Sequence, residues 1–142
     1  MIRYAHLSDA MSLNQINTLS LGYEVTPDVT IKKLDLILNN PNHILLVFEG
    51  IEGKVLGYVH GEIYDTLYAP TAINILGLAV LKSHQSQGIG KKLMLQIETE
   101  GVKKDAHFIR LNSGSERQGA HRFYEKLGYA TNKTQLNLIK HL

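Results

Sequence analysis

The order of apolar and polar positions along the chain predicts ten alternating segments. Apolar residues recur at helical spacing in the segments 8–19, 27–38, 91–100 and 118–127. Alternation or short apolar runs predict strands at 1–5, 43–49, 55–64, 72–81, 108–112 and 134–142, the last of which is only weakly patterned. The resulting order is β-α-α-β-β-β-α-β-α-β, which predicts an α/β fold.

Local signals at the ends of the helices support this order. Ser8 can act as the N-cap of the first helix, and Thr26, with a proline directly after it, is typical of the start of the second. Gly128 is the expected C′ residue after the last helix. We therefore expect one domain over residues 1–142, with a mixed, mostly antiparallel central sheet flanked by helices. A right-handed crossover would run through the helix at 91–100.

Composition restricts the class of protein. The chain has a formal net charge of +2, and its Lys and Arg residues occur in runs of no more than two, so we expect no nucleic-acid partner. It has no cysteine, and its 7 histidines show no metal-ligand spacing, so we expect neither disulfides nor a metal site. With no signal peptide or membrane-spanning run, we expect a cytoplasmic protein without a membrane partner. A homodimer through an edge strand would be ordinary for such a sheet.

The most informative motif is the segment 85–92, Gln-Ser-Gln-Gly-Ile-Gly-Lys-Lys, between a predicted strand and a predicted helix. Two glycines one residue apart leave backbone N–H groups bare at a helix N-terminus, which favours binding of a phosphate or pyrophosphate. A P-loop would need Ser or Thr in place of Lys92, and a dinucleotide fingerprint would need Gly in place of Leu93. A kinase-type glycine loop lies between two strands of a far longer chain.

The pattern Gln-x-x-Gly-x-Gly after an apolar strand resembles the acetyl-CoA loop of the GNAT superfamily of N-acetyltransferases. A second segment, Ala120–Tyr129, resembles the Ala-x-x-Phe-Tyr-x-x-x-Gly-Phe segment that follows the fifth strand in this superfamily. The opening Ile2-Arg3, with Asp9 at the first helix, is also similar to the superfamily's usual beginning. The resemblance covers essentially the whole chain and agrees with the predicted order of elements.

The resemblance implies that acetyl-CoA is the co-substrate. In the superfamily, the loop holds the pyrophosphate and the preceding strand pairs with the pantetheine arm. The residues that these roles imply here are Leu78, Ala79, Val80, Gln85, Ser86, Gln87, Gly88, Ile89, Gly90 and Lys91. Arg117 departs from the Asn that many relatives have, and it would bind a phosphate or the substrate instead.

The resemblance also implies a direct attack of an amine on the thioester. Tyr124 stands where the superfamily places a general acid for the departing thiolate, and a phenol is protonated at neutral pH. A backbone N–H near Val80 would stabilise the oxyanion. The general base is undecided, because Asn74 stands where some relatives carry Glu. Other relatives use an ordered water held by polar groups, and the side-chain candidates for the base here are Glu24, His60 and Glu62.

The resemblance also indicates which segments would bind the acceptor. Segments that form the acceptor site in the superfamily offer carboxylates among aromatic rings, which suit a cationic amine. These residues are Tyr23, Glu24, Glu62, Tyr64, Asp65 and Tyr68. The leading hypothesis is a primary amine of a small cationic molecule. The alternatives are a peptide or protein amine, or a non-catalytic acyl-CoA-binding sensor.

Overall fold

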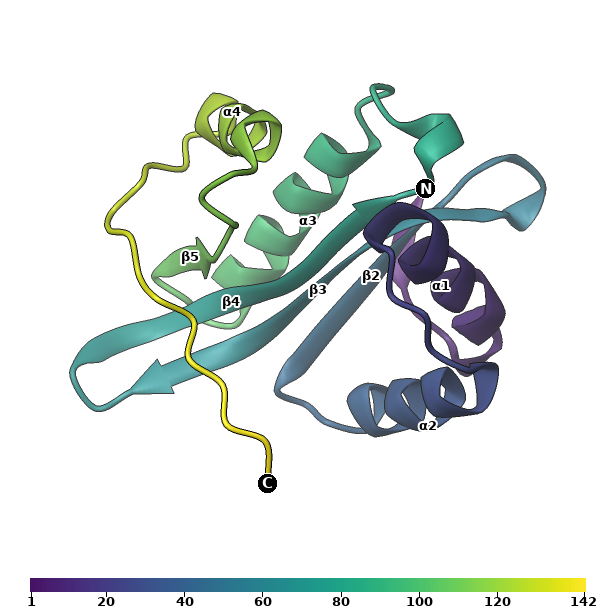
Figure 1. Ribbon diagram of the computed structural model, residues 1–142, viewed down its shortest axis with the longest axis horizontal. Coiled ribbons are helices and arrows are strands. Elements are labelled where there is room, and N and C mark those ends of the chain that lie inside the picture. The colour runs from purple at the N-terminus through teal and green to yellow at the C-terminus, as the bar shows by residue number, and fades with distance from the viewer. The chain divides into compact units, whose positions relative to one another are not determined.

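The computed structural model describes all residues from 1 to 142. By its internal contacts the chain forms two compact units, Met1–Leu111 and Asn112–Leu142, which we call the first and the second unit. The first unit holds a five-stranded sheet with three α-helices, and the second unit holds the helix α4 (Figure 1). No helix is both long enough and apolar enough to cross a membrane.

The sheet has the strand order β1-β2-β3-β4-β5. Its strands are β1 (Ile2–Tyr4), β2 (His43–Glu49), β3 (Val55–Thr66), β4 (Ala69–Val80) and β5 (Phe108–Leu111). The first four strands pair antiparallel, and β5 pairs parallel to β4 after a crossover through a helix. The predicted mixed, mostly antiparallel sheet is thus confirmed. The hairpin between β3 and β4 is longer than predicted, because both strands continue to a tight turn at Leu67 and Tyr68.

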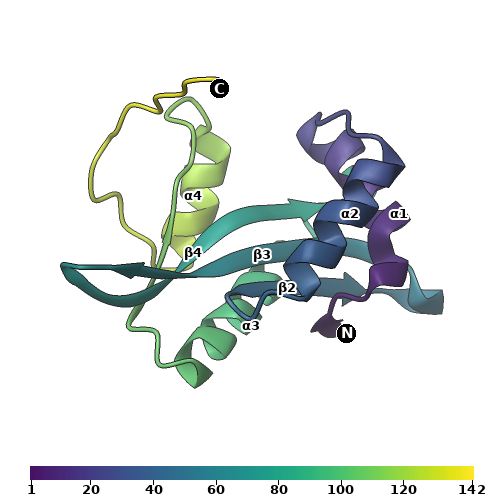
Figure 2. The same ribbon diagram turned by 90° about the horizontal axis from the view of Figure 1, so that it is seen from below.

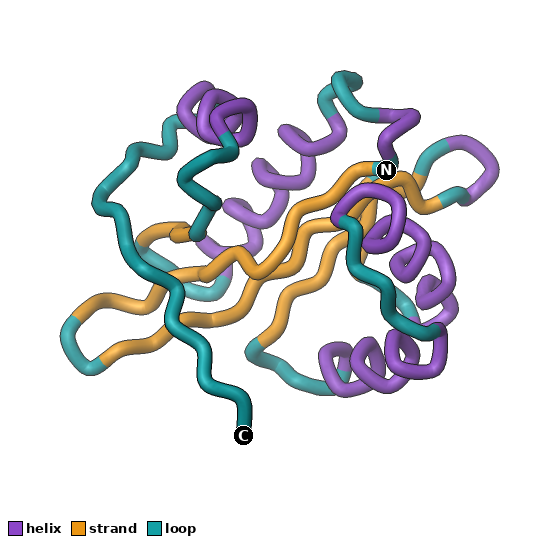
Figure 3. Tube along the Cα trace, in the orientation of Figure 1, coloured by secondary structure: helices purple, strands orange, loops and turns teal.

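Helices cover both faces of this sheet. Figure 2 shows α1 (Ala10–Ile16) and α2 (Pro27–Leu38) on one face and α3 (Ile89–Lys103) on the other. A π-helical turn, Asn17–Leu21, follows α1, and single 3-10 turns occupy Leu7–Asp9, Ile51–Gly53 and Lys82–His84 (Figure 3). The largest fully buried side chains come from α1, α3 and the central strands: Ile16, Ile44, Leu46, Val47, Val59, Ile73, Leu93, Met94 and Ile97.

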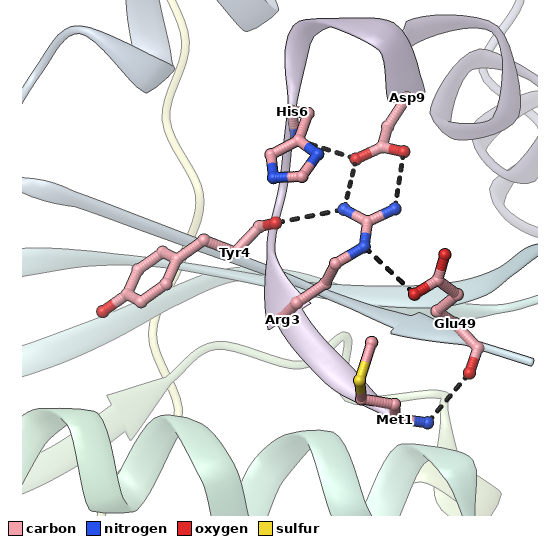
Figure 4. Close-up of polar contacts among 6 residues, drawn as sticks. All are labelled: Met1, Arg3, Tyr4, His6, Asp9 and Glu49. Carbon is pink, nitrogen blue, oxygen red and sulfur yellow. Dashed lines mark hydrogen bonds and ion pairs between the residues drawn. The ribbon is translucent and has the colours of Figure 1, made fainter. Parts of the chain in front are cut away.

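The start of α1 is fixed by a charged contact rather than by the predicted cap. The carboxylate of Asp9 accepts the backbone N–H of His6 at 2.8 Å and pairs in two-pronged fashion with the guanidinium of Arg3, at 2.8 and 3.0 Å (Figure 4). Ser8 lies inside the 3-10 turn and is not the N-cap, so this prediction was wrong. At α2 the prediction was right, because the Thr26 hydroxyl accepts the N–H of Val29.

The second unit contains α4 (Gln118–Lys126) followed by an irregular segment. Gly128 adopts a φ of 95°, which fits the predicted C′ position. The strand predicted at 134–142 is wrong, because this segment has no regular structure (Figure 3). Its residues are exposed, and no strand of the sheet pairs with it. A weakly alternating segment forms a strand only when a partner satisfies its backbone.

Candidate functional site

The central feature of the candidate site is the part of β4 that extends beyond β5. Pairing between the two strands runs from Ala72 to Ile75 and stops there, while β4 continues to Val80. Leu76 is an extra residue in the pairing with β3, because His60 lies opposite Gly77 and Gly61 lies opposite Ile75. Such a β-bulge bends a strand away from its neighbour. The end of β4 therefore has β3 as its only strand partner.

The glycine loop begins directly after this strand. Residues 85–88 are exposed, and the side-chain amide of Gln85 donates to the carbonyl of Val80 at 3.2 Å, which ties the loop to the strand end. Ser86 and Gly88 adopt φ values of 67° and 82°, so the loop turns sharply before α3. Consecutive N–H groups in such a turn form an anion-binding concavity.

No side chain caps α3, because its N-cap residue is Gly88. The first N–H groups of the helix are therefore left for a ligand, and the helix dipole favours a negative one. A Cβ atom at Gly88 would meet no heavy atom within 4 Å, so the space in front of the helix is open. The side chains of Ile89, Leu93 and Ile97 are buried and hold the helix against the sheet.

Gly57 on β3 brings the start of α3 close to the end of β4. A Cβ atom at this position would lie 2.9 Å from the carbonyl oxygen of Ala79 and 3.4 Å from the Ile89 side chain. Both neighbours belong to the predicted phosphate and pantetheine region. This supporting role was not predicted, because a glycine within an apolar run gives no signal until its neighbours in space are known.

A chain of polar side chains crosses the sheet on the face that α1 and α2 cover. Asn74 on β4 donates to the Glu62 carboxylate on β3 at 3.3 Å and accepts from the Arg110 guanidinium on β5 at 2.7 Å. Arg110 also stacks over the ring of Tyr64, 4.6 Å from its centroid. Glu62 and Tyr64 thus lie on one face of β3, and Arg110 already covers one side of the Tyr64 ring.

The connector after α1 reaches the same face of the sheet. The Tyr58 hydroxyl on β3 donates to the side chain of Asn17, and the backbone N–H of Tyr23 donates to the carbonyl of Asn17. Burial raises the pKa of Tyr58 to about 12, with a smaller contribution from the neighbouring Tyr23. Tyr23 and Glu24 are exposed on this connector.

Comparison with known families identifies the family to which the chain belongs. A family model described as the acetyltransferase (GNAT) family matches residues 10–129, which include the glycine loop and α4. The chain belongs to the GNAT acetyltransferase family. No functionally curated protein matches the sequence.

Solved structures share the GNAT fold at low sequence identity. A protein of Agrobacterium tumefaciens strain C58, provisionally named an acetyltransferase, is 20% identical, with a TM-score of 0.88 and 99% of each chain covered. An aminoglycoside 6'-N-acetyltransferase of Acinetobacter haemolyticus is 12% identical, with a TM-score of 0.85 and coverage of 100% of this chain and 99% of that one. The aminoglycoside enzyme AAC(6')-Iy, solved with a bisubstrate analogue of CoA and acetylneamine, is 16% identical, with a TM-score of 0.86 and coverage of 100% and 98%.

The general acid implied by the GNAT resemblance lies in the second unit. Tyr124 is half-buried on α4, between the rings of Phe123 and Tyr129, whose centroids lie 5.1 and 5.9 Å from its own. Burial raises the pKa of Tyr124, and the charge of Arg117 opposes this rise. The phenol therefore keeps its proton at neutral pH. Arg117 directly precedes α4 and is exposed.

The candidates for the general base differ in their surroundings. Glu24 is exposed, whereas Glu62 is half-buried and held by Asn74. His60 is also half-buried and contacts the imidazole of His43. The position where some GNAT enzymes carry Glu is thus filled by an amide that holds a carboxylate on the neighbouring strand. The sequence alone does not show that the carboxylate at this place comes from Glu62 on β3, because the register of the two strands decides it.

Proposed function

We propose that this GNAT protein transfers an acetyl group from acetyl-CoA to a primary amine. The observation that supports this most strongly is the continuity between the end of β4, which has no β5 partner, and the glycine loop before α3. An extended pantetheine arm can add to the strand, and the pyrophosphate can reach the N–H groups at the helix start. Leu78, Ala79 and Val80 would hold the arm, with residues 85–91 at the phosphates.

The reaction in this proposal is a direct attack by the amine. The nitrogen bonds to the thioester carbonyl carbon, and a backbone N–H near Val80 stabilises the oxyanion. The carbon–sulfur bond then breaks, and the thiolate takes the phenolic proton of Tyr124. The raised pKa of Tyr124 supports this role, since it keeps the acid protonated before the transfer. Arg117 would contact a phosphate of CoA or the substrate.

The acceptor that the site supports best is a small molecule with a primary amine and a positive charge. We take the sheet face that α1 and α2 cover as the acceptor face, where β3 carries both the Glu62 carboxylate and the aromatic ring of Tyr64. Tyr23 and Glu24 would add further contacts from the connector. The similarity of fold to aminoglycoside acetyltransferases gives this class a natural first probe.

A panel of amines tests the proposal. Spermidine, kanamycin, free lysine and a peptide with a free N-terminus are incubated with acetyl-CoA, and thiol release and acetylated product are measured together. Transfer to spermidine or kanamycin supports the proposed class, and transfer to the peptide alone points to the peptide alternative. Tight binding of acetyl-CoA without any acetylated product would instead favour the acyl-CoA sensor.

The role of Tyr124 is tested in the same assay. In Tyr124→Phe we expect kcat to fall about 100-fold with an unchanged KM for acetyl-CoA, because only proton donation is lost. Tyr129→Phe is the matched control, since it removes a hydroxyl from the neighbouring ring of the same aromatic cluster. Equal activity of Tyr124→Phe and the unaltered protein would remove the acid assignment.

A further inference from the structure

Two histidines on the acceptor face of the sheet form a hydrogen-bonded pair. Nδ1 of His43 on β2 lies 2.8 Å from Nε2 of His60 on β3, and their ring centroids are 5.0 Å apart with a tilt of 34°. Both side chains are half-buried. A contact of this length requires one ring nitrogen to donate and the other to accept, so the two imidazoles share one proton along the contact.

The position of this pair links it to the end of β4. His60 lies on β3 between Tyr58 and Glu62, which point to the same face because side chains alternate along a strand. On β4 its partner in the register is Gly77, which follows the bulge at the point where β4 leaves β5. Gly77 has no side chain, and the ring of Tyr58 packs over it, since a Cβ atom there would lie 3.5 Å from the Tyr58 hydroxyl oxygen.

We propose that the His60–His43 pair carries the proton released by the acceptor amine to solvent, a role that rests on the proposed acetyl transfer. Nδ1 of His60, the nitrogen that does not face His43, accepts the proton directly or through one water. Nε2 of His60 then passes its proton to Nδ1 of His43, and Nε2 of His43 releases one to solvent.

The protons of the reaction balance with this route. An ammonium group that becomes an amide loses two protons in all. One of them is equivalent to the proton that the thiolate gains through Tyr124, and the other leaves to solvent. The histidine pair is assigned to the second of these. No oxidant, reductant or further reactant is needed.

The surroundings keep the pair suited to this transfer. Burial, with a smaller contribution from the adjacent His43, lowers the pKa of His60 to about 4, so His60 is neutral at pH 7. A neutral imidazole accepts a proton at one nitrogen while it releases one from the other.

Few other charges face the pair. On its own strand His60 has Tyr58 and Glu62 as titratable neighbours, while Gly77 and Asn74 on β4 carry no charge. The helix α1, which packs on β3, contains no titratable side chain. The helix α2 packs on β2, and all its charged side chains are exposed: Asp28, Lys32, Lys33 and Asp35.

Chemical rescue tests this role. With the panel amine that the unaltered protein acetylates fastest, His60→Ala should lower kcat about 100-fold and leave the KM for acetyl-CoA unchanged. Added imidazole should restore the rate after subtraction of the uncatalysed reaction, and the rescue should increase with pKa along a series of substituted imidazoles. His107→Ala, which removes an exposed histidine before β5, should keep its activity and not respond to imidazole.

Two conservative variants keep the test decisive if His60→Ala does not fold. In His60→Gln and His43→Asn, the amide can retain the hydrogen bond of the pair but cannot pass a proton along it. Both should fold normally and lower kcat by at least about tenfold. Unchanged kcat in either variant overturns the proposal, as does absent rescue or rescue independent of imidazole pKa. If the unaltered protein acetylates no amine at all, the proposed function itself fails, and this role with it.

Discussion

The two sides of the β4 end are built from different kinds of group. On the loop side the candidate contacts are backbone N–H groups from one continuous segment, residues 85–91. On the acceptor face they are side chains from four strands, with His43, Glu62, Asn74 and Arg110 among them. This contrast predicts that variants on one side leave binding at the other side unaltered.

The largest effect is expected from a negative charge in the loop. Gly88→Asp places a carboxylate in the open space before α3, and we expect the Kd for acetyl-CoA to rise about 100-fold through repulsion of the pyrophosphate. Gly88→Asn is the matched control, because Asn and Asp tolerate a positive φ similarly. Isothermal titration should show the difference between the two variants shrinking at high salt. Equal Kd values for Asp and Asn would contradict a phosphate at this position.

The second prediction concerns a contact that should affect the stability of the fold but not ligand binding. Asp9→Asn removes a buried carboxylate that Arg3 pairs with at two oxygens, and we expect the free energy of unfolding to fall by about 2 kcal/mol. Glu49→Gln, which loses a longer 3.3 Å contact with the same Arg3, should cost less than about 1 kcal/mol. Urea unfolding measures both. Neither variant should change the Kd for acetyl-CoA.

The same contact sets the direction of the pH dependence of stability. The hydrogen bonds from Arg3 are the main cause that lowers the pKa of Asp9 in the folded chain. Asp9 therefore stabilises the fold fully above its unfolded pKa, near 4, and loses this contribution as the pH falls through the lower folded value. The difference in stability between the unaltered protein and Asp9→Asn should narrow below pH 4. A constant difference down to pH 2 would contradict this assignment.

The features that could be predicted from the sequence are those set by the local backbone, and the features that were missed depend on side chains from different strands. The helix ends at Thr26 and Gly128 depend on local backbone preferences, which are visible in short segments, and the structure confirms both. The glycine segment forms a tight turn before α3, while its binding of a phosphate stays a prediction. The N-cap of α1 was predicted wrongly at Ser8. The residue at this position is Asp9, whose carboxylate pairs with Arg3, six residues earlier, and this contact is not visible in a local sequence pattern. The link from Glu62 through Asn74 to Arg110 joins three strands, and only their register reveals it. The strand at 134–142 was predicted from a weak pattern, and no strand of the sheet pairs with this segment.

The smallest predicted effect concerns the acceptor face. It tests most directly whether the side chains of this face and the backbone groups of the loop act separately. Asn74→Leu keeps a side chain of similar size but removes both the donor to Glu62 and the acceptor for Arg110. We expect the KM for the amine to rise about tenfold, because the carboxylate that would receive the ammonium loses its orientation. The Kd for acetyl-CoA should stay within about twofold, since the loop side is built from backbone groups of another segment.

Asn42→Leu is the control for this variant, because Asn42 is an exposed asparagine in the turn before β2. It should leave both constants unchanged. If Asn74→Leu instead weakened acetyl-CoA binding as much as amine binding, the two sides of the β4 end would be coupled through the strand itself. The bulge at Leu76, two residues from Asn74, would then transmit a shift on the acceptor face to the edge that holds the pantetheine arm. Only a change confined to the KM for the amine agrees with two separately built sides.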